Sequence, residues 1–116
     1  MFWGTVELEP EVRDWYLQLR SDHRARAAFR IDRLADLGPL LDEPLTRQLD
    51  GKLRELRFSL DGQAIRITYW IAPGRRIVLL TVFAKTKRRE VHQVERARHA
   101  MDRCAKEQHT PDEEDF

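Results

Sequence analysis

The first third of the chain predicts one strand followed by two helices. Residues 2–8 are rich in aromatic and β-branched side chains, which favour a strand. Apolar residues recur at helical spacing over residues 10–19, where Pro10 occupies an early helical position. A second helical pattern begins at Ser21 or Asp22 and ends at Gly38-Pro39. Together these two segments predict a helical hairpin.

The middle of the chain predicts a three-stranded meander. Residues 39–50 carry scattered leucines and are expected to form a loop, after which the pattern changes to a two-residue period. Residues 53–60 and 64–72 are predicted strands joined by Asp61-Gly62, a strong hairpin turn signal. Residues 76–83 are almost continuously apolar, which is typical of a central strand covered on both faces.

The last third predicts a long helix and a tail. Residues 87–106 are highly charged but keep apolar residues on one side, so we expect a helix. Residues 107–116 contain five acidic and no basic residues and are predicted to be a disordered tail. The order β-α-α-β-β-β-α therefore indicates a single α+β domain over residues 1–106.

Composition adds limits on the environment of the protein. The 116 residues fit one domain, and no apolar run approaches the length of a membrane span. The first residues lack the basic start and apolar stretch of a signal peptide. Cys104 is a lone cysteine, so it can form no internal disulfide and no CxxC metal pair. We expect a protein of the reducing cytoplasm.

The net charge of +1 hides a strong asymmetry. Residues 51–106 hold fourteen Lys/Arg and five Asp/Glu, a net charge of +9, whereas residues 1–50 are at −3 and residues 107–116 at −5. The basic segment is a candidate phosphate-binding surface, because cations placed on a nucleic-acid backbone release condensed counterions. The alternative is a solvated ionic surface in an arginine-rich protein. Charge alone leaves both interpretations open.

Four short motifs resemble those of one protein family. They are the L-D-G-K-L-R-E-L-R run at residues 49–57, the R-x-x-Y at 66–69, the F-A-K-T-K strand end at 83–87 and the E-V-x-x-V pattern opening residues 90–97. Their order and spacing resemble the HigB-like, phage-derived toxins of the RelE/ParE superfamily, and the resemblance covers nearly the whole chain outside the acidic tail.

That resemblance implies a RelE-like fold, with a twisted sheet, a helical hairpin on one side and a basic concave face that enters the ribosomal A site. It implies a type II toxin: a ribosome-dependent endoribonuclease that cuts messenger RNA by attack of the 2′-hydroxyl, with no metal and no cofactor. The implied partners are the ribosome and its message, and an antitoxin, commonly of the helix-turn-helix type, which would also bind operator DNA. No membrane partner is implied.

The resemblance also indicates which residues carry the chemistry. RNA cleavage without metal needs a base for the 2′-hydroxyl proton, cations for the phosphate and an acid for the leaving oxygen. Arg57 and Arg66 lie where such toxins keep basic functional residues, and we expect them to stabilise the phosphate and the transition state. The alternative for Arg66 is a structural ion pair with Glu55 across the strands. The residues expected to bind RNA are Lys52, Arg54, Lys85, Lys87 and Arg88.

Two further residues have open roles. His92 falls near the place of a functional tyrosine in RelE-like toxins, and its imidazole can serve as acid or base, so it is a candidate catalytic residue; the alternative is an exposed helix histidine. Glu55 is either a general base or an ion-pair partner. Three cations at residues 87–89 are predicted to open the final helix, where the dipole prefers anions, which suggests a phosphate partner or a surface charge run. The remaining histidines lack metal-ligand spacing with Cys104, so no zinc site is predicted.

Two other functions fit the same sequence. A ParE-like toxin would share the fold and poison DNA gyrase without cutting RNA. A non-catalytic nucleic-acid-binding or regulatory module is the second alternative. The cluster of Arg57, Arg66 and Lys85 favours the nuclease.

Overall fold

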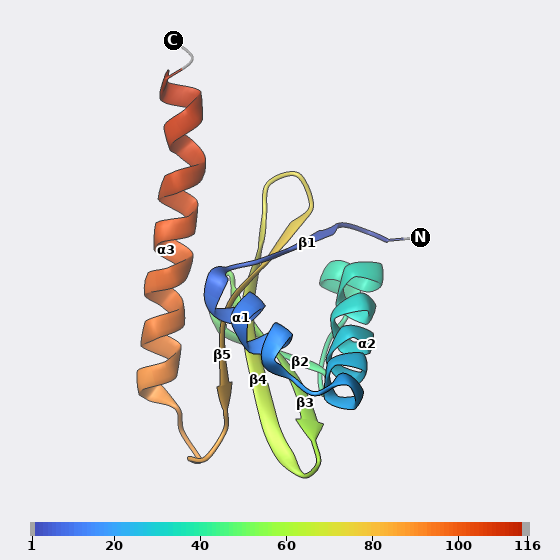
Figure 1. The fold of residues 1–116 in the computed structure, drawn as a ribbon. Helices are drawn as coiled ribbons and strands as arrows, with labels where there is room; N and C mark the ends of the chain where they lie inside the picture. The colour runs from blue at the N-terminus through green and yellow to red at the C-terminus, as the bar shows by residue number, and fades with distance from the viewer. Residues whose placement is uncertain (1, 115–116) are drawn as a thin grey trace.

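A five-stranded mixed sheet forms the centre of the protein (Figure 1). The computed structural model describes the backbone of residues 2–114 and the side chains of residues 2–107. The strands are β1 (Thr5–Leu8), β2 (Thr46–Asp50), β3 (Leu53–Leu60), β4 (Gln63–Ala72) and β5 (Arg76–Ala84). Their order in the sheet is β1-β5-β4-β3-β2. β1 runs parallel to β5, and all other neighbours are antiparallel.

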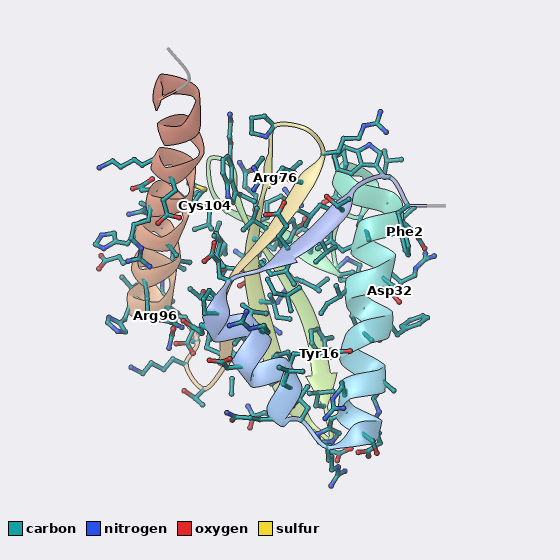
Figure 2. The ribbon with its side chains drawn as sticks, turned by 45° about the horizontal axis from the view of Figure 1, so that its top comes forward. Phe2, Tyr16, Asp32, Arg76, Arg96 and Cys104 are labelled. Atoms are coloured by element: carbon teal, nitrogen blue, oxygen red, sulfur yellow. The ribbon has the colours of Figure 1, made fainter. Side chains whose placement is uncertain are left out.

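Helices cover both faces of this sheet. They are α1 (Pro10–Gln18), α2 (Ser21–Leu37) and α3 (Val91–Glu114), with a short 3₁₀ turn at Gly38–Leu40. Figure 1 shows α2 on one side of the sheet and α3 on the other. The helical hairpin of α1 and α2 buries the larger core, which includes Val12 and Tyr69. α3 buries a smaller core that includes Trp70 and Cys104, and Cys104 points from the helix toward the sheet (Figure 2).

The predicted α+β architecture is confirmed. The N-terminal strand, the helical hairpin, the meander and the final helix follow one another in the predicted order. The β3–β4 connection is the predicted tight hairpin, in which Asp61 and Gly62 have φ values of 48° and 81°. Two successive positive φ angles are the backbone that a two-residue hairpin turn needs, and this explains the Asp-Gly pair.

One strand was missed. The segment predicted as a loop over residues 39–50 contains β2, which pairs antiparallel with β3. β2 is an edge strand with one fully buried side chain, Thr46, and a half-buried Leu49. Because its side chains are mostly exposed and polar, the alternation that reveals a half-buried strand is absent from its sequence.

Element ends also differ from the prediction. β1 begins at Thr5 rather than Phe2. α3 begins at Val91, so the cations at residues 87–89 precede the helix instead of opening it. The described backbone of α3 is helical to Glu114, where an irregular tail was predicted from residue 107; residues 115–116 lie outside the described part of the chain. The high proportion of charged residues after Lys106 gave no apolar periodicity from which that extension could be predicted.

Candidate functional site

The sheet face beneath α3 is apolar at one end and charged at the other. Alternation along β4 places Trp70 in the core under α3 and sends Thr68 and Arg66 to the same face, progressively nearer the start of the helix. Thr68 meets Thr81 of β5 through a buried hydroxyl pair at 2.6 Å. Beyond this pair the face carries charged side chains, with Arg66 directly across the ladder from Phe83. The small core beneath α3 therefore ends where the charged part of this sheet face begins.

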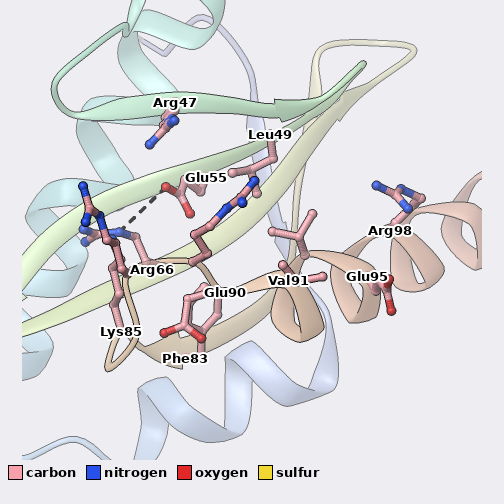
Figure 3. A pocket seen from close by; sticks show the side chains of 13 residues that line it. Arg47, Leu49, Glu55, Arg66, Phe83, Lys85, Glu90, Val91, Glu95 and Arg98 are labelled. Atoms are coloured by element: carbon pink, nitrogen blue, oxygen red, sulfur yellow. Dashed lines mark ion pairs between the residues drawn. The ribbon is translucent and has the colours of Figure 1, made fainter.

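A cavity of about 350 Å³ occupies this charged end, between the sheet and the first turns of α3 (Figure 3). β2, β3, β4 and β5 all contribute to its lining, as does the connection from β5 to α3. Six of the lining residues are cations and three are carboxylates, so the local charge is strongly positive. The cations are Arg47, Arg66, Lys85, Arg88, Arg89 and Arg98; the carboxylates are Glu55, Glu90 and Glu95; the apolar members are Leu49, Phe83, Val91 and Val94.

Glu55 is the acidic centre of the cavity. It lies on β3 directly opposite Arg47 of β2, and its carboxylate oxygen is 3.6 Å from Arg57 Nε and 3.7 Å from Arg66 Nε. The register also places Arg57 and Arg66 directly opposite each other on β3 and β4. Both distances exceed that of a normal N–H···O hydrogen bond, so these contacts are electrostatic. The carboxylate therefore sits among three guanidinium groups and keeps oxygen lone pairs available to a ligand.

Burial shifts the pKa values of Glu55 and Arg66 in the directions that favour their neutral forms. The side chains of Glu55 and Arg66 are only 9% and 11% exposed. Burial raises the pKa of Glu55, and the nearby Arg66, Arg57, Arg47 and Lys85 oppose that rise without cancelling it. Burial, followed by the charge of Arg57, lowers the pKa of Arg66, and Glu55 opposes that change. The strand frame thus holds a carboxylate more basic than usual beside concentrated positive charge.

Arg57 has an unsatisfied donor in this cluster. Its Nε is buried and has no hydrogen-bond partner among the described residues. Its backbone N–H donates to Leu45 O at 2.8 Å, which fixes β3 against the chain leading into β2. Arg66 is held at its other end, because Nη1 donates to Ile65 O at 3.0 Å. The buried Nε of Arg57 is not open to a ligand, so a phosphate contact falls to the exposed part of its guanidinium group.

The structure brings several predicted residues together. Arg66, Lys85 and Arg88 line the cavity with Glu55, and Arg57 adjoins it through its contact with Glu55. Arg57 and Arg66 come from neighbouring strands, whereas Lys85 and Arg88 come from the β5–α3 connection. Glu55 also lies within ion-pair distance of Arg66. Its position therefore fits both interpretations, a general base and an ion-pair partner, and only a test of its chemistry distinguishes them.

Other predicted residues lie elsewhere. Arg54 is on the opposite face of β3, where it donates to Thr46 Oγ1 at 3.0 Å and Tyr69 Oη at 3.4 Å. Lys52 is exposed in the β2–β3 turn and does not line the cavity. The two-residue period of β3 explains the position of Arg54, because neighbours of Glu55 in sequence must point away from it. We therefore do not retain Arg54 or Lys52 as RNA-binding candidates for this cavity.

Lys87 and His92 form a separate surface beside the cavity. They line a second hollow of about 360 Å³ at the start of α3, which shares Arg89, Glu90 and other lining residues with the main cavity. His92 is exposed and does not reach the Glu55 cluster. A catalytic role for His92 at Glu55 is therefore not supported by the geometry. The contiguity of the two hollows is compatible with contact to an adjacent part of a long ligand.

Sequence reasoning missed two cations of the cavity and gave a third no individual role. Arg47 belongs to the edge strand that was not predicted. Arg98 comes from the second turn of α3 and forms an ion pair with Asp50 at 2.7 Å, which joins the helix to the end of β2. Arg89 was considered only as one of the three cations at residues 87–89, for which a phosphate partner and a surface charge run were both left open. Arg98 follows Val94 by four residues and Val91 by seven, which places the three on one side of a helix with 3.6 residues per turn; this spacing is the signal available for Arg98.

The described residues contain neither a candidate metal centre nor a membrane-spanning helix. No group of three or more His, Cys, Asp and Glu side chains among them could hold a metal ion. None of the described helices has the length and apolar character required to cross a membrane.

Comparisons with known proteins agree with this architecture. The family model of the phage-derived, Gp49-like proteins matches residues 14–103. Among solved structures, the free-state structure of an E. coli RelE toxin variant with two arginine-to-alanine substitutions is similar, with a TM-score of 0.57 and 14% identity. The match covers 80% of this chain and 93% of that one. A search of curated proteins gives no match.

Proposed function

Because the chain belongs to the family of phage-derived Gp49-like proteins and has the fold of the RelE toxin, we propose that it is the toxin of a type II toxin–antitoxin system and cuts messenger RNA on the ribosome. The observation that carries the proposal is the gathering of Arg66, Lys85 and Arg88 around the buried Glu55 in one cavity. A basic cavity with one carboxylate at its centre combines phosphate binding with proton transfer.

The cations supply binding and transition-state stabilisation. Arg66 and Arg57 come from adjacent strands and present guanidinium groups from one side of Glu55. Planar guanidinium groups donate paired hydrogen bonds to phosphate oxygens, and their effect grows as the phosphate gains charge in the transition state. Lys85 and Arg88, at the rim formed by the β5–α3 connection, hold the RNA backbone on either side of the scissile bond.

Glu55 acts as the general base. Burial raises the pKa of its carboxyl, so its ionised form accepts a proton more readily than a surface carboxylate does. It takes the proton of the ribose 2′-hydroxyl, the 2′-oxygen forms a bond to phosphorus, and the bond from phosphorus to the 5′-oxygen breaks. The 5′-oxygen leaves with a proton from surrounding water. The protonated Glu55 then gives its proton to the hydroxide that remains, and the products are a 2′,3′-cyclic phosphate and a 5′-hydroxyl.

The same proposal includes the partners. A protein that cuts message requires neutralisation in the cell that makes it, so we propose a cognate antitoxin, of the helix-turn-helix type that the HigB-like resemblance implies. Through that antitoxin the pair would bind operator DNA. The message reaches the cavity in the ribosome, because a site built mainly for phosphate and ribose has few groups with which to select a free RNA sequence.

The proposal is tested by adding purified protein to a cell-free translation reaction with one defined message. Wild-type protein is expected to cut the message at codon boundaries only when ribosomes are translating, and Arg66→Ala is expected to cut far less. Arg33→Ala, an exposed cation on α2, serves as the matched control and should cut like wild type. A parallel DNA gyrase assay gives the contrary outcome: gyrase poisoning with intact message would establish the ParE-like alternative. Intact message with unaffected gyrase would favour the non-catalytic module.

A further inference from the structure

The connection between β5 and α3 carries four cations in five residues but is held by one carboxylate. Lys85, Lys87, Arg88 and Arg89 occupy residues 85–89, and like charges so close in sequence repel one another. Lys85 is anchored at its N-terminal side, because its backbone N–H donates to Ala64 O at 2.8 Å. The remainder of the connection has to be held by other contacts if its side chains are to keep fixed positions at the cavity.

Glu90 provides those contacts. A single oxygen of its carboxylate, Oε1, accepts hydrogen bonds from the backbone N–H of Thr86 at 3.0 Å and of Lys87 at 2.8 Å. The backbone carbonyl of Glu90 also accepts a hydrogen bond from Val94 N at 3.0 Å, which begins the α3 ladder. One residue therefore ties the connection to the first turn of the helix. Glu90 is one of the side chains drawn around the cavity in Figure 3.

These hydrogen bonds dominate the ionisation of Glu90. The two backbone N–H groups, and less strongly the charges of Lys87 and Lys85, lower the pKa of its carboxyl. The carboxylate is thus ionised and occupied at neutral pH. An anion in a phosphate-binding cavity would ordinarily weaken binding through repulsion. The presence of the Glu90 carboxylate in this cavity is explained if its function is to accept the backbone N–H groups of the β5–α3 connection.

We propose that Glu90 is the positioning residue of this site: its Oε1 fixes the connection at Thr86 and Lys87, and this sets the places of Lys85 and Arg88 around the RNA phosphate. This inference rests on the proposed ribonuclease function and assigns Glu90 no contact with the reacting atoms. It acts by geometry, through hydrogen-bond acceptance, and its charge is secondary. The conservative variant Glu90→Gln retains an Oε1 that can accept both N–H groups, whereas Glu90→Ala retains none.

The experiment measures binding and local order separately, in a Glu55→Gln background that prevents cleavage. Binding is measured by fluorescence anisotropy with a short fluorescein-labelled single-stranded RNA, and order by amide hydrogen exchange at Thr86 and Lys87. We expect Glu90→Ala to bind about tenfold more weakly and to lose protection of both amides, since two hydrogen bonds are removed. Glu90→Gln should keep most of both. Glu95→Ala is the matched control, because it removes the same charge from the same cavity wall and should bind no more weakly than the parent.

The outcomes separate this inference from the function on which it rests. If wild-type protein leaves the message intact in the translation reaction, the proposed function fails and the role of Glu90 with it. If the parent binds and Glu90→Ala binds equally well, only the positioning role is overturned. A Glu90→Gln protein that behaves like Glu90→Ala in both measurements would also overturn it, because charge and not hydrogen-bond geometry would then hold the connection.

Discussion

Replacing Glu55 with Gln separates a general base from a structural ion-pair partner. At 3.6 and 3.7 Å, each of Arg57 and Arg66 attracts the carboxylate by roughly 4–5 kcal/mol at an effective dielectric constant of about 20. Transferring the carboxylate from water into this buried site opposes that attraction with a desolvation cost of several kcal/mol. The raised pKa of Glu55 shows which contribution is larger: its surroundings disfavour the charged form overall. A neutral side chain of the same shape should therefore cost no stability.

We expect Glu55→Gln to unfold with a free energy equal to that of wild type, or larger by up to about 1 kcal/mol, at neutral pH. The sign of the difference in unfolding free energy between the two proteins follows from its pH dependence. Well below the ordinary carboxyl pKa of 4.5, Glu55 is protonated in both the folded and unfolded states, so the two proteins differ only by Gln against Glu. As the pH rises from 4.5 through the raised folded-state pKa, wild type loses the stability that protonation provided, and the advantage of the variant grows to a constant value.

The assay is urea unfolding followed by tryptophan fluorescence at several pH values, together with cleavage of message in the translation reaction. Cleavage should fall by about 10²- to 10⁴-fold, the usual contribution of a positioned base. Glu95→Gln controls for the loss of an exposed cavity carboxylate. A loss of about 3–5 kcal/mol on replacing Glu55 is the cost of breaking a buried ion pair from one side. That loss, with cleavage retained in the folded fraction, would refute the base and establish the structural pair.

Three further predictions address the cations, metal dependence and the core. Arg57→Ala and Arg66→Ala should each restore growth to cells producing the protein without its partner and lower the cleavage rate by about 10²- to 10³-fold; unchanged toxicity in both would reject the phosphate assignment. Excess EDTA should leave the cleavage of a purified ribosome–message complex unchanged in buffer whose magnesium is restored for ribosome integrity, and dependence on a transition metal would contradict the proposed chemistry. Leu34→Ala, at a fully buried position of α2, should lower the free energy of unfolding by about 2–5 kcal/mol in urea titration, and a loss below about 1 kcal/mol would contradict the described core.

Much of the fold could be predicted because its elements have strong periodicity or turn chemistry. The continuous apolar run of β5 reflects a strand buried by α1 on one face and α3 on the other, and Asp61-Gly62 reflects two positive φ angles. β2 could not be predicted in this way, since an edge strand with exposed polar side chains has no apolar alternation. The start of α3 was predicted too early because residues 87–89 are good helix formers. In the structure the backbone N–H groups of Thr86 and Lys87 donate to the side chain of Glu90, and the helix begins only after that residue.

The candidate site was predictable where strand alternation determined it. Glu55, Arg57 and Arg66 share one face because they are two residues apart or directly paired across the ladder. The same rule excludes Arg54, and applying it at the sequence level would have removed that residue. The positions of Arg47, Arg98 and His92 depend on tertiary packing, namely the pairing of β2 and the angle of α3 over the sheet. Short-range patterns in the sequence contain no information about either.

The chemical nature of the RNA ends tests the central claim most directly. Message cut by wild-type protein on translating ribosomes should carry a 2′,3′-cyclic phosphate upstream of the break and a 5′-hydroxyl downstream, and substitution of a 2′-deoxyribose at the cut site should abolish the break. Ends bearing a 3′-hydroxyl and a 5′-phosphate, or undiminished cutting at the deoxy position, would contradict attack by the 2′-oxygen and with it the role of Glu55 at the centre of the cavity.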